Sequence, residues 1–137
     1  MWYRRMFGLV VVGAAVAGAA VACKKDSTAP CLPKDLSGSW ALLGLTEPPN
    51  PPIGPPSATG TLTLTATRYK VHIDITIPSP TTVDDSGAYH VTCTAIDETS
   101  DNVSNGQATG SYTLSHDTLT VNVTSQAVNV ITVWKKQ

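Results

Sequence analysis

Two histidines and an aspartate fall on the polar faces of strand-like segments, where they could hold a metal ion. His72 and Asp74 are two residues apart in the alternating stretch RYKVHIDITI, and His90 lies on the same kind of face in a later stretch. Neutral imidazoles and a carboxylate are suitable ligands for zinc or copper. No spacing among the three is specific for such a site, and solvated surface side chains are the simpler interpretation. We therefore expect no metal site and no cofactor.

Catalysis by paired acids or by an activated nucleophile also lacks residues in a suitable arrangement. Glycoside hydrolysis needs two carboxylates across a cleft, whereas most acids of this chain fall in predicted turns. These acids are Asp84, Asp85, Asp97, Glu98, Asp101 and Asp117. Serine occurs mostly in polar connections, without a Gly-x-Ser-x-Gly motif, and a glycine-rich phosphate loop is missing from the sequence. We therefore expect a protein that is not an enzyme.

The N-terminal residues have the layout of a secretory signal peptide. MWYRRM carries two arginines and no acid, and the next sixteen residues, 7–22, are uncharged and end in Ala-Val-Ala. A transmembrane anchor is the alternative, but it needs about 20 apolar residues, and this run is shorter and rich in alanine and glycine. A cut after Ala22 makes Cys23 the first residue of the mature protein.

The stretch around Cys23 resembles the lipobox of bacterial lipoproteins, in which the cysteine after the cut is acylated on its thiol and its new amino group. Ala20 stands where leucine is most frequent in that motif. The resemblance implies a lipoprotein signal peptide at residues 1–22 and two or three acyl chains on Cys23 that hold the protein to a membrane. Lys24, rather than aspartate, implies sorting to the outer membrane of a Gram-negative cell envelope, facing the periplasm or the cell surface. The alternative is an ordinary secreted protein that begins with cysteine.

Export leaves two further cysteines, Cys31 and Cys93, in a compartment where disulfides persist. A bridge between them would close a loop of about 62 residues and stabilise the fold by on the order of 4 kcal/mol. The alternative is a buried free thiol at Cys93, on the apolar face of its strand, and an exposed thiol at Cys31. The sequence leaves both possibilities open.

The charge of the mature chain excludes one class of partner. Removal of Arg4 and Arg5 leaves seven of the nine basic residues against ten acidic ones, which gives a net charge of −3. Nucleic-acid binding needs clustered basic side chains, so we expect no nucleic-acid partner. The sequence does not identify a protein partner. The remaining 115 residues are enough for one small domain.

Two segments are predicted to lie outside strands. Residues 23–36 are poor in large apolar side chains and predict a flexible tether between the membrane and a domain at residues 37–137. Six of the ten prolines fall between Pro48 and Pro56, where they remove backbone donors and favour an extended loop. We expect this loop to connect the first two strands.

Apolar and polar residues alternate from Gly60 onward. In residues 61–67 two leucines and an alanine share one face and four threonines share the other, and residues 68–77 follow the same rule. This pattern is typical of antiparallel strands with one buried face. His116 and Asp117 fit a two-residue hairpin turn. The alternation resumes in residues 89–95, 112–114 and 119–123. Seven or eight short strands with close turns predict an all-β barrel or sandwich.

The predicted domain resembles, over most of its length, the small lipocalin-like domains of bacterial lipoproteins. The resemblance rests on Gly38-Ser39-Trp40, GTLTLTATRY at 60–69, GSYTLSHDTLTV at 110–121 and Trp134-Lys135-Lys136. It implies a small antiparallel β-barrel in which Trp40 packs at the closed end and Lys135 or Lys136 caps it through a cation–π contact. The chain departs from a full lipocalin because it is shorter and lacks a Thr-Asp-Tyr triplet.

An immunoglobulin-like β-sandwich is the alternative fold. Residues 84–93, DDSGAYHVTC, resemble the Asp-x-Gly-x-Tyr-x-Cys corner of immunoglobulin domains. Here Cys93 follows Tyr89 by four residues instead of two, and Cys31 lies in the predicted tether. These departures favour the barrel.

The lipocalin-like resemblance implies a barrel that binds a small apolar or amphipathic ligand on its inner face. The residues expected to contact that ligand share the inward, apolar positions of the strands: Trp40, Leu62, Leu64, Tyr69, Val71, Ile73, Tyr89 and Tyr112. The same side chains could instead fill the barrel as a core. In that alternative the protein is a non-catalytic structural, adhesion or assembly module.

Overall fold

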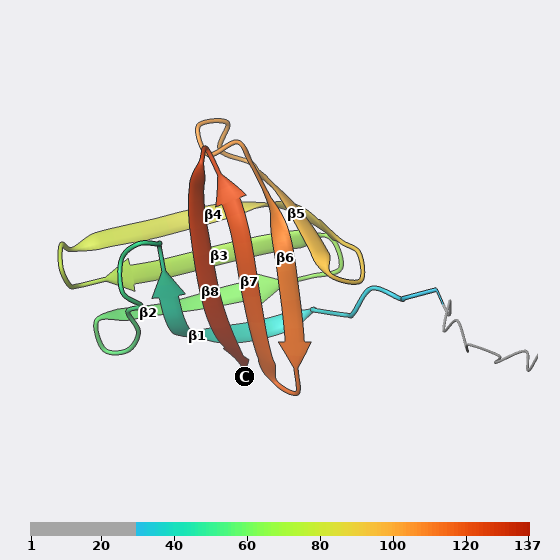
Figure 1. The fold of residues 1–137 in the computed structure, drawn as a ribbon, viewed down its shortest axis with the longest axis horizontal. Helices are drawn as coiled ribbons and strands as arrows, with labels where there is room; N and C mark the ends of the chain where they lie inside the picture. Colours follow the sequence, from blue (N-terminus) through green and yellow to red (C-terminus); the bar gives the residue numbers. More distant parts are fainter. Residues whose placement is uncertain (1–29) are drawn as a thin grey trace, which may run out of the picture.

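The computed structural model describes residues 30–137, which form a closed antiparallel barrel of eight strands (Figure 1). Each strand pairs with its neighbours in the sequence, and the first strand pairs with the last. The strands are β1 (Gly38–Thr46), β2 (Ala58–Leu64), β3 (Arg68–Ile75), β4 (Thr81–Val91), β5 (Ala95–Ser100), β6 (Gln107–Ser115), β7 (Thr118–Ser125) and β8 (Val128–Lys136). The predicted barrel is therefore confirmed, and the immunoglobulin-like sandwich is excluded because one sheet closes on itself. Within the described residues, no helix is long and apolar enough to cross a membrane.

The alternation of the sequence sets which side chains point into the barrel. Leu62 of β2 pairs with Val71 of β3, and Leu64 pairs with Tyr69, so these apolar side chains share the inner face. Thr61 and the residue opposite it, His72, take the outer face. A slip of one residue in this register would expose the whole apolar set, so the alternation fixes the pairing.

Two strands extend farther than their sequences predict. Asp84 and Asp85 lie within β4, and Asp97 and Glu98 lie within β5, where turns are expected from their polarity. The expectation that these acids lie in turns is wrong. Strand pairing is a backbone interaction, and a closed barrel offers each strand two neighbours, so polar stretches are held in the sheet despite low strand propensity.

The two connections with clear sequence signals adopt the predicted places. The proline-rich residues 47–57 join β1 to β2, and Ile53 within them exchanges two backbone hydrogen bonds with Leu45, of 2.7 and 2.8 Å. His116 and Asp117 form the turn between β6 and β7, with His116 at a positive φ of 54°. Both connections are therefore confirmed.

One end of the barrel is closed by a packed core. We call it the closed end, and it carries the β2–β3, β4–β5 and β6–β7 turns; the other four connections lie at the open end. Trp40, Trp134, Leu36 and Leu119 are the largest side chains that are fully buried. The indole Nε1 of Trp40 donates a hydrogen bond of 3.0 Å to the carbonyl of Leu36. The ammonium group of Lys136 lies 5.3 Å from the centre of the Trp40 ring, as the cation–π expectation requires.

The segment before β1 covers this closed end. Residues 23–36 are expected to be a flexible tether, but of the part that the structure describes, Leu36 is only 1% exposed. The backbone N–H of Lys34 donates a hydrogen bond to the hydroxyl of Tyr112 (3.3 Å), and its ammonium group donates one to the carbonyl of Leu114 (2.8 Å). The packed domain therefore begins before residue 37. The predicted signal peptide at 1–22 and the predicted acylation site Cys23 lie outside the described residues.

Close approach between strands requires glycine at two inward positions. A Cβ atom at Gly87 would lie 2.1 Å from the carbonyl of Thr99 and 2.8 Å from the ring of Tyr69. A Cβ atom at Gly110 would lie 1.9 Å from the carbonyl of Asn122. Glycines at such positions let the strands bend sharply, which a small barrel needs in order to close.

Candidate functional site

A cavity of about 470 Å³ occupies the open half of the barrel, and each strand from β2 to β8 contributes to its lining. Val71 and Ile73 of β3 form one wall, while Val121 and Val123 of β7, four strands away around the barrel, form another. These side chains line the cavity because they occupy the inward positions of their strands. Pockets that bind small molecules are of this size and are lined mainly by apolar side chains.

The cavity has an apolar floor and an open mouth. Trp134, which is 2% exposed, lies at its closed-end side. Val83 of β4 and Val128 of β8 line it near the open end, where they are 40% and 42% exposed. Because β4 and β8 lie on different sides of the barrel, the cavity is reached from solvent between them.

The eight residues expected to contact a ligand divide into two groups. Leu62, Tyr69, Val71 and Ile73 line the cavity. The other four lie in the buried core outside the cavity lining: Trp40, Leu64, Tyr89 and Tyr112. They pack toward the closed end, where the hydroxyl of Tyr89 donates to the carbonyl of Thr65 (2.6 Å). The structure therefore assigns these four to packing.

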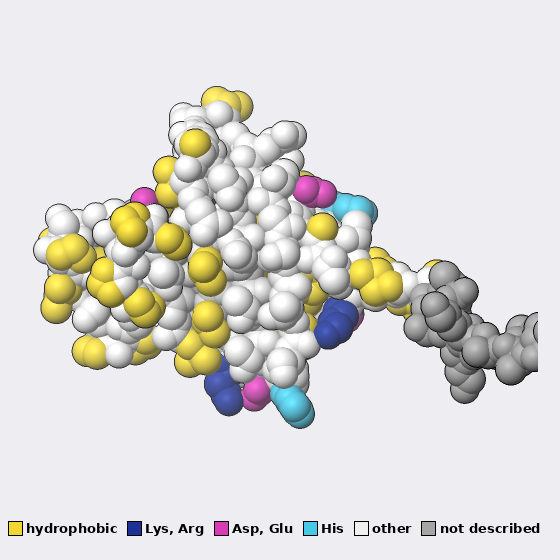
Figure 2. All heavy atoms as spheres, in the orientation of Figure 1, with side chains coloured by type: hydrophobic (Ala, Val, Ile, Leu, Met, Phe, Trp, Pro, Cys, Tyr) yellow, Lys and Arg dark blue, Asp and Glu magenta, His cyan; other side chains and the backbone are white. Residues whose placement is uncertain are grey.

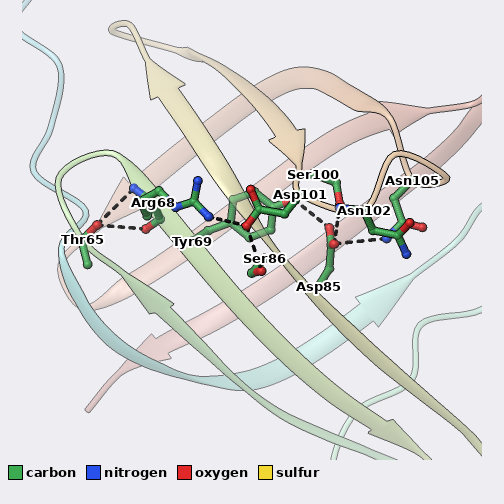
Figure 3. A network of polar contacts seen from close by, with 9 residues as sticks. All are labelled: Thr65, Arg68, Tyr69, Asp85, Ser86, Ser100, Asp101, Asn102 and Asn105. Atoms are coloured by element: carbon green, nitrogen blue, oxygen red, sulfur yellow. Dashed lines mark hydrogen bonds and ion pairs between the residues drawn. The ribbon is translucent and has the colours of Figure 1, made fainter.

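Asp85 is the centre of a polar network at the cavity wall (Figure 3). Its carboxylate accepts hydrogen bonds from the hydroxyl of Tyr69 (2.7 Å), the hydroxyl of Ser100 (2.5 Å) and the amide of Asn105 (3.1 Å). Burial acts to raise the pKa of Asp85, but these hydrogen bonds outweigh it and hold the pKa below its usual range. Asp85 is therefore ionised at neutral pH. Burial and the bond to Asp85 raise the pKa of Tyr69, which stays protonated as a donor.

Glu98 also lines the cavity, but no side chain or backbone group in residues 30–137 donates a hydrogen bond to it. Every side-chain oxygen or nitrogen in these residues that is sealed from solvent has a partner. The unpartnered carboxyl group of Glu98 therefore reaches the open space of the cavity. Burial, together with the negative charge of Asp85, raises the pKa of Glu98 to about 7.

The acids of the cavity were missed by sequence reasoning, although a signal for them exists. Glu98 is two residues from Ile96, which is buried, and Asp85 is four residues from Tyr89, also buried. Extending the inward parity of each strand by one or two steps places both carboxyl groups inside the barrel. Val121 and Val123 lie on a predicted inward face but were not assigned to the site, and no face was predicted for Trp134.

The histidines lie on the outside of the barrel and are not brought together. His72 contacts Asp84 through Nδ1 (2.6 Å) and Asp74 through Nε2 (3.0 Å), and all three side chains are exposed. These hydrogen bonds raise the pKa of His72. His90 instead lies opposite Asp97 on β5. Among residues 30–137 no group of three His, Cys, Asp or Glu side chains is arranged to hold a metal ion.

The two cysteines of the described region are joined. Cys31 and Cys93 form a disulfide with their Cα atoms 5.6 Å apart. The bridge ties the segment before β1 to the β4–β5 turn at the closed end. It lies away from the cavity, so its contribution is to the fold.

Solved structures of similar fold support this architecture, whereas the sequence itself has no match. No family model matches the chain, and no curated protein matches it. A crystal structure of an uncharacterized protein from Bacteroides eggerthii superimposes with a TM-score of 0.51 at 12% identity, covering 75% of this chain and 100% of that one. A lipocalin-like protein from Bacteroides uniformis superimposes with a TM-score of 0.52 at 14% identity, covering 76% of this chain and 100% of the other. The chain therefore has a lipocalin-like barrel fold.

Proposed function

We propose that this protein binds a small apolar or amphipathic molecule inside its barrel, as a lipid-anchored component of the cell envelope. The observation that carries the binding proposal is the cavity of about 470 Å³ enclosed by the strands. The alternative of a filled barrel is disfavoured because side chains leave this space open. The proposal includes no catalytic step.

The lining of the cavity supports an apolar body for the ligand. Valine and isoleucine side chains from β3, β7 and β8 face the open space, so a bound hydrocarbon group is removed from water on several sides. Each methylene group buried in this way contributes about 0.8 kcal/mol. A chain of about ten buried methylenes therefore contributes on the order of 8 kcal/mol, from which the cost of association is subtracted.

The surface around the open end supports an apolar route into the cavity. Ile77 in the β3–β4 connection and Val103 in the β5–β6 connection are 60% and 93% exposed. Figure 2 shows hydrophobic side chains gathered over the end of the molecule where the β1–β2 and β3–β4 connections lie. Exposed apolar groups beside a cavity mouth are typical of binding surfaces.

Titration with decanol, a neutral molecule with a single hydrocarbon chain, tests the binding proposal. We suggest the mature chain with Cys23→Ser, which prevents acylation, and the fluorescence of Trp134 in the cavity wall as the signal. We expect saturable binding with one site, and weaker binding in Val123→Phe, whose larger side chain takes up part of the cavity. Asn122→Phe, directed to the outside of β7, is the matched control. Unchanged fluorescence and an unchanged melting temperature at saturating decanol would contradict the proposal.

Anchoring rests on the sequence around Cys23 and has its own test. The proposed site is the outer membrane, with the domain facing the periplasm or the cell surface. The intact mass of the protein extracted from its native membranes is expected to equal residues 23–137 plus a diacylglyceryl group, with or without an N-acyl chain. A mass without lipid would make the protein a soluble exported one and would leave the binding proposal untouched.

A further inference from the structure

We propose that the ligand of the barrel is a cationic amphiphile, an apolar molecule with a protonated amine that binds at the carboxylates of Glu98 and Asp85. This inference rests on the proposed function, because it names the chemical class of the molecule in the same cavity. The cavity itself is the site, and the two acids decide which end group it accepts.

The charges around the cavity are of one sign. Glu98 and Asp85 both line it, and no lysine or arginine of residues 30–137 does so. Arg68 is paired with Asp101, and Lys135 is paired with Asp117 at the β6–β7 turn. Lys34 and Lys136 lie at the closed end, and Lys70 takes the outer face of β3. A carboxylate ligand would therefore meet two acids and no compensating cation.

The two acids differ in how their hydrogen-bonding capacity is used. Asp85 accepts three hydrogen bonds from protein side chains, so it is held in place and stays ionised. Glu98 accepts none from the described residues and reaches the cavity space. A carboxylate that is desolvated by its surroundings but lacks a donor gains most from a donor that a ligand supplies. An ammonium group supplies three donors and a positive charge.

An amine would also change the ionisation of Glu98. Its pKa of about 7 means that the free protein carries Glu98 partly protonated at neutral pH. A nearby ammonium group favours the ionised form and lowers that pKa. Affinity for an amine is therefore linked to pH. The titratable groups that face Glu98 are Asp85 and Tyr89 from β4 and Tyr69 from β3, and the facing residue of β6 is Ala108. Asp85 titrates below this range and the tyrosines above it.

Three molecules with the same chain length separate the possible end groups. We suggest decylamine, decanol and decanoate, titrated below their micellar concentrations into the mature chain with Cys23→Ser at pH 8. The expected order of affinity is decylamine, then decanol, then decanoate, with about tenfold or more between the amine and the alcohol, as a charge-assisted hydrogen bond gives. Lowering the pH from 8 to 5 is expected to weaken decylamine binding about tenfold while leaving decanol binding nearly unchanged.

Glu98→Gln and Asp97→Asn form a matched pair of variants, because Asp97 is the next residue of β5 and is exposed on the outer face. We expect Glu98→Gln to weaken decylamine about tenfold and Asp97→Asn to leave it unchanged, with the melting curve of each variant showing that it is folded. Two results would overturn the amine assignment alone, provided that decanol binds. In the first, decanoate binds as tightly as decylamine or more tightly. In the second, decylamine affinity is unchanged by Glu98→Gln and does not depend on pH in the unmodified protein. Failure of all three molecules to bind would overturn the proposed function as well.

Discussion

The hydroxyl of Tyr69 on β3 donates a 2.7 Å hydrogen bond to the carboxylate of Asp85 on β4, inside the barrel. The same tyrosine packs over Gly87, where its ring occupies the space that a larger residue would need. Tyr69 therefore packs against the closely approaching strands at Gly87 and also donates a hydrogen bond to the charged Asp85 in the cavity wall. Removal of the hydroxyl group alone removes the second contact and keeps the first.

Tyr69→Phe is expected to lower the free energy of unfolding by about 1 kcal/mol at pH 7, because Asp85 keeps only its other donors. The pKa of Asp85 is depressed in the folded state, so the stability it contributes is present above its ordinary pKa of 3.8 and is lost as the pH falls through its folded value. The difference between the variant and the unmodified protein should therefore shrink as the pH falls from 3.8 through the lower, folded-state pKa of Asp85. Urea unfolding over a pH series measures this difference in the free energy of unfolding.

Tyr89→Phe is the control, because Tyr89 also donates a short hydrogen bond, but to the backbone carbonyl of Thr65. Its cost should be independent of pH across the same range, since no carboxylate is involved. Identical pH profiles for the two variants would contradict the role given to the Tyr69 and Asp85 pair.

Glu98→Gln is expected to stabilise the free protein at high pH. The folded-state pKa of about 7 exceeds the ordinary 4.5, so the folded state binds the proton more tightly and stability falls as the pH rises through this interval. The variant lacks this loss and should exceed the unmodified protein by on the order of 3 kcal/mol at pH 8, with little difference at pH 4. Thermal or urea unfolding at the two pH values checks this. Equal stability at pH 8 would mean that Glu98 is not desolvated by the barrel.

Removal of the disulfide is expected to destabilise the domain without changing the shape of the cavity. Cys31 and Cys93 are 62 residues apart, and a loop of this length corresponds to about 4 kcal/mol on the chain-entropy estimate. The double variant Cys31→Ser, Cys93→Ser should unfold at a lower denaturant concentration and should be insensitive to reducing agent. If reduction of the unmodified protein leaves its unfolding midpoint unchanged, the bridge contributes nothing to the stability of the fold.

Lys136→Gln is expected to cost about 0.5 to 1 kcal/mol through loss of the cation–π contact with Trp40. The neighbouring Lys135→Gln removes an exposed ion pair with Asp117 and should lower the stability less, because solvent screens the attraction between exposed charges. Chemical unfolding of the two variants under the same conditions compares them. A larger loss of stability in Lys135→Gln than in Lys136→Gln would contradict the assignment of Lys136 as the lysine that stabilises the closed end.

Much of the fold could be predicted because a barrel built from neighbouring strands is encoded locally. The parity of Leu62, Leu64, Tyr69 and Val71 places four side chains on the inner face, and the prolines between β1 and β2, which lack a backbone donor, mark a connection between strands. Closure between β1 and β8 follows from the need to protect two strand edges. Trp40 and Lys136, far apart in sequence, meet at the seam that this closure makes.

The candidate site was less predictable because its polar residues contradict the local pattern. Asp85 and Glu98 lie in segments whose composition favours turns, and only pairing with neighbouring strands keeps them in the sheet. Parity also fails to distinguish cavity from core. Tyr112 and Val121 are both inward and are paired across β6 and β7, yet only Val121 lines the cavity. Which inward side chains line the cavity depends on how the closed end is filled.

Leu36 illustrates the same limit at the start of the domain. It precedes β1 in a stretch rich in charge and proline, which favours a tether. It is buried because Trp40 bonds its carbonyl and because the disulfide holds Cys31 nearby at the closed end. Both contacts are tertiary, and the sequence around Leu36 carries no signal for them.

Mapping of a bound ligand by backbone amide NMR tests the central claim most directly. Titration of the mature chain carrying Cys23→Ser with decylamine is predicted to shift the resonances of Val71, Glu98, Val121 and Val123 around the cavity. Those of Leu64 and Tyr112 in the core outside the cavity should stay in place. Resonance shifts confined to the outer faces of the strands, or no shifts at saturating ligand, would contradict a ligand site inside the barrel.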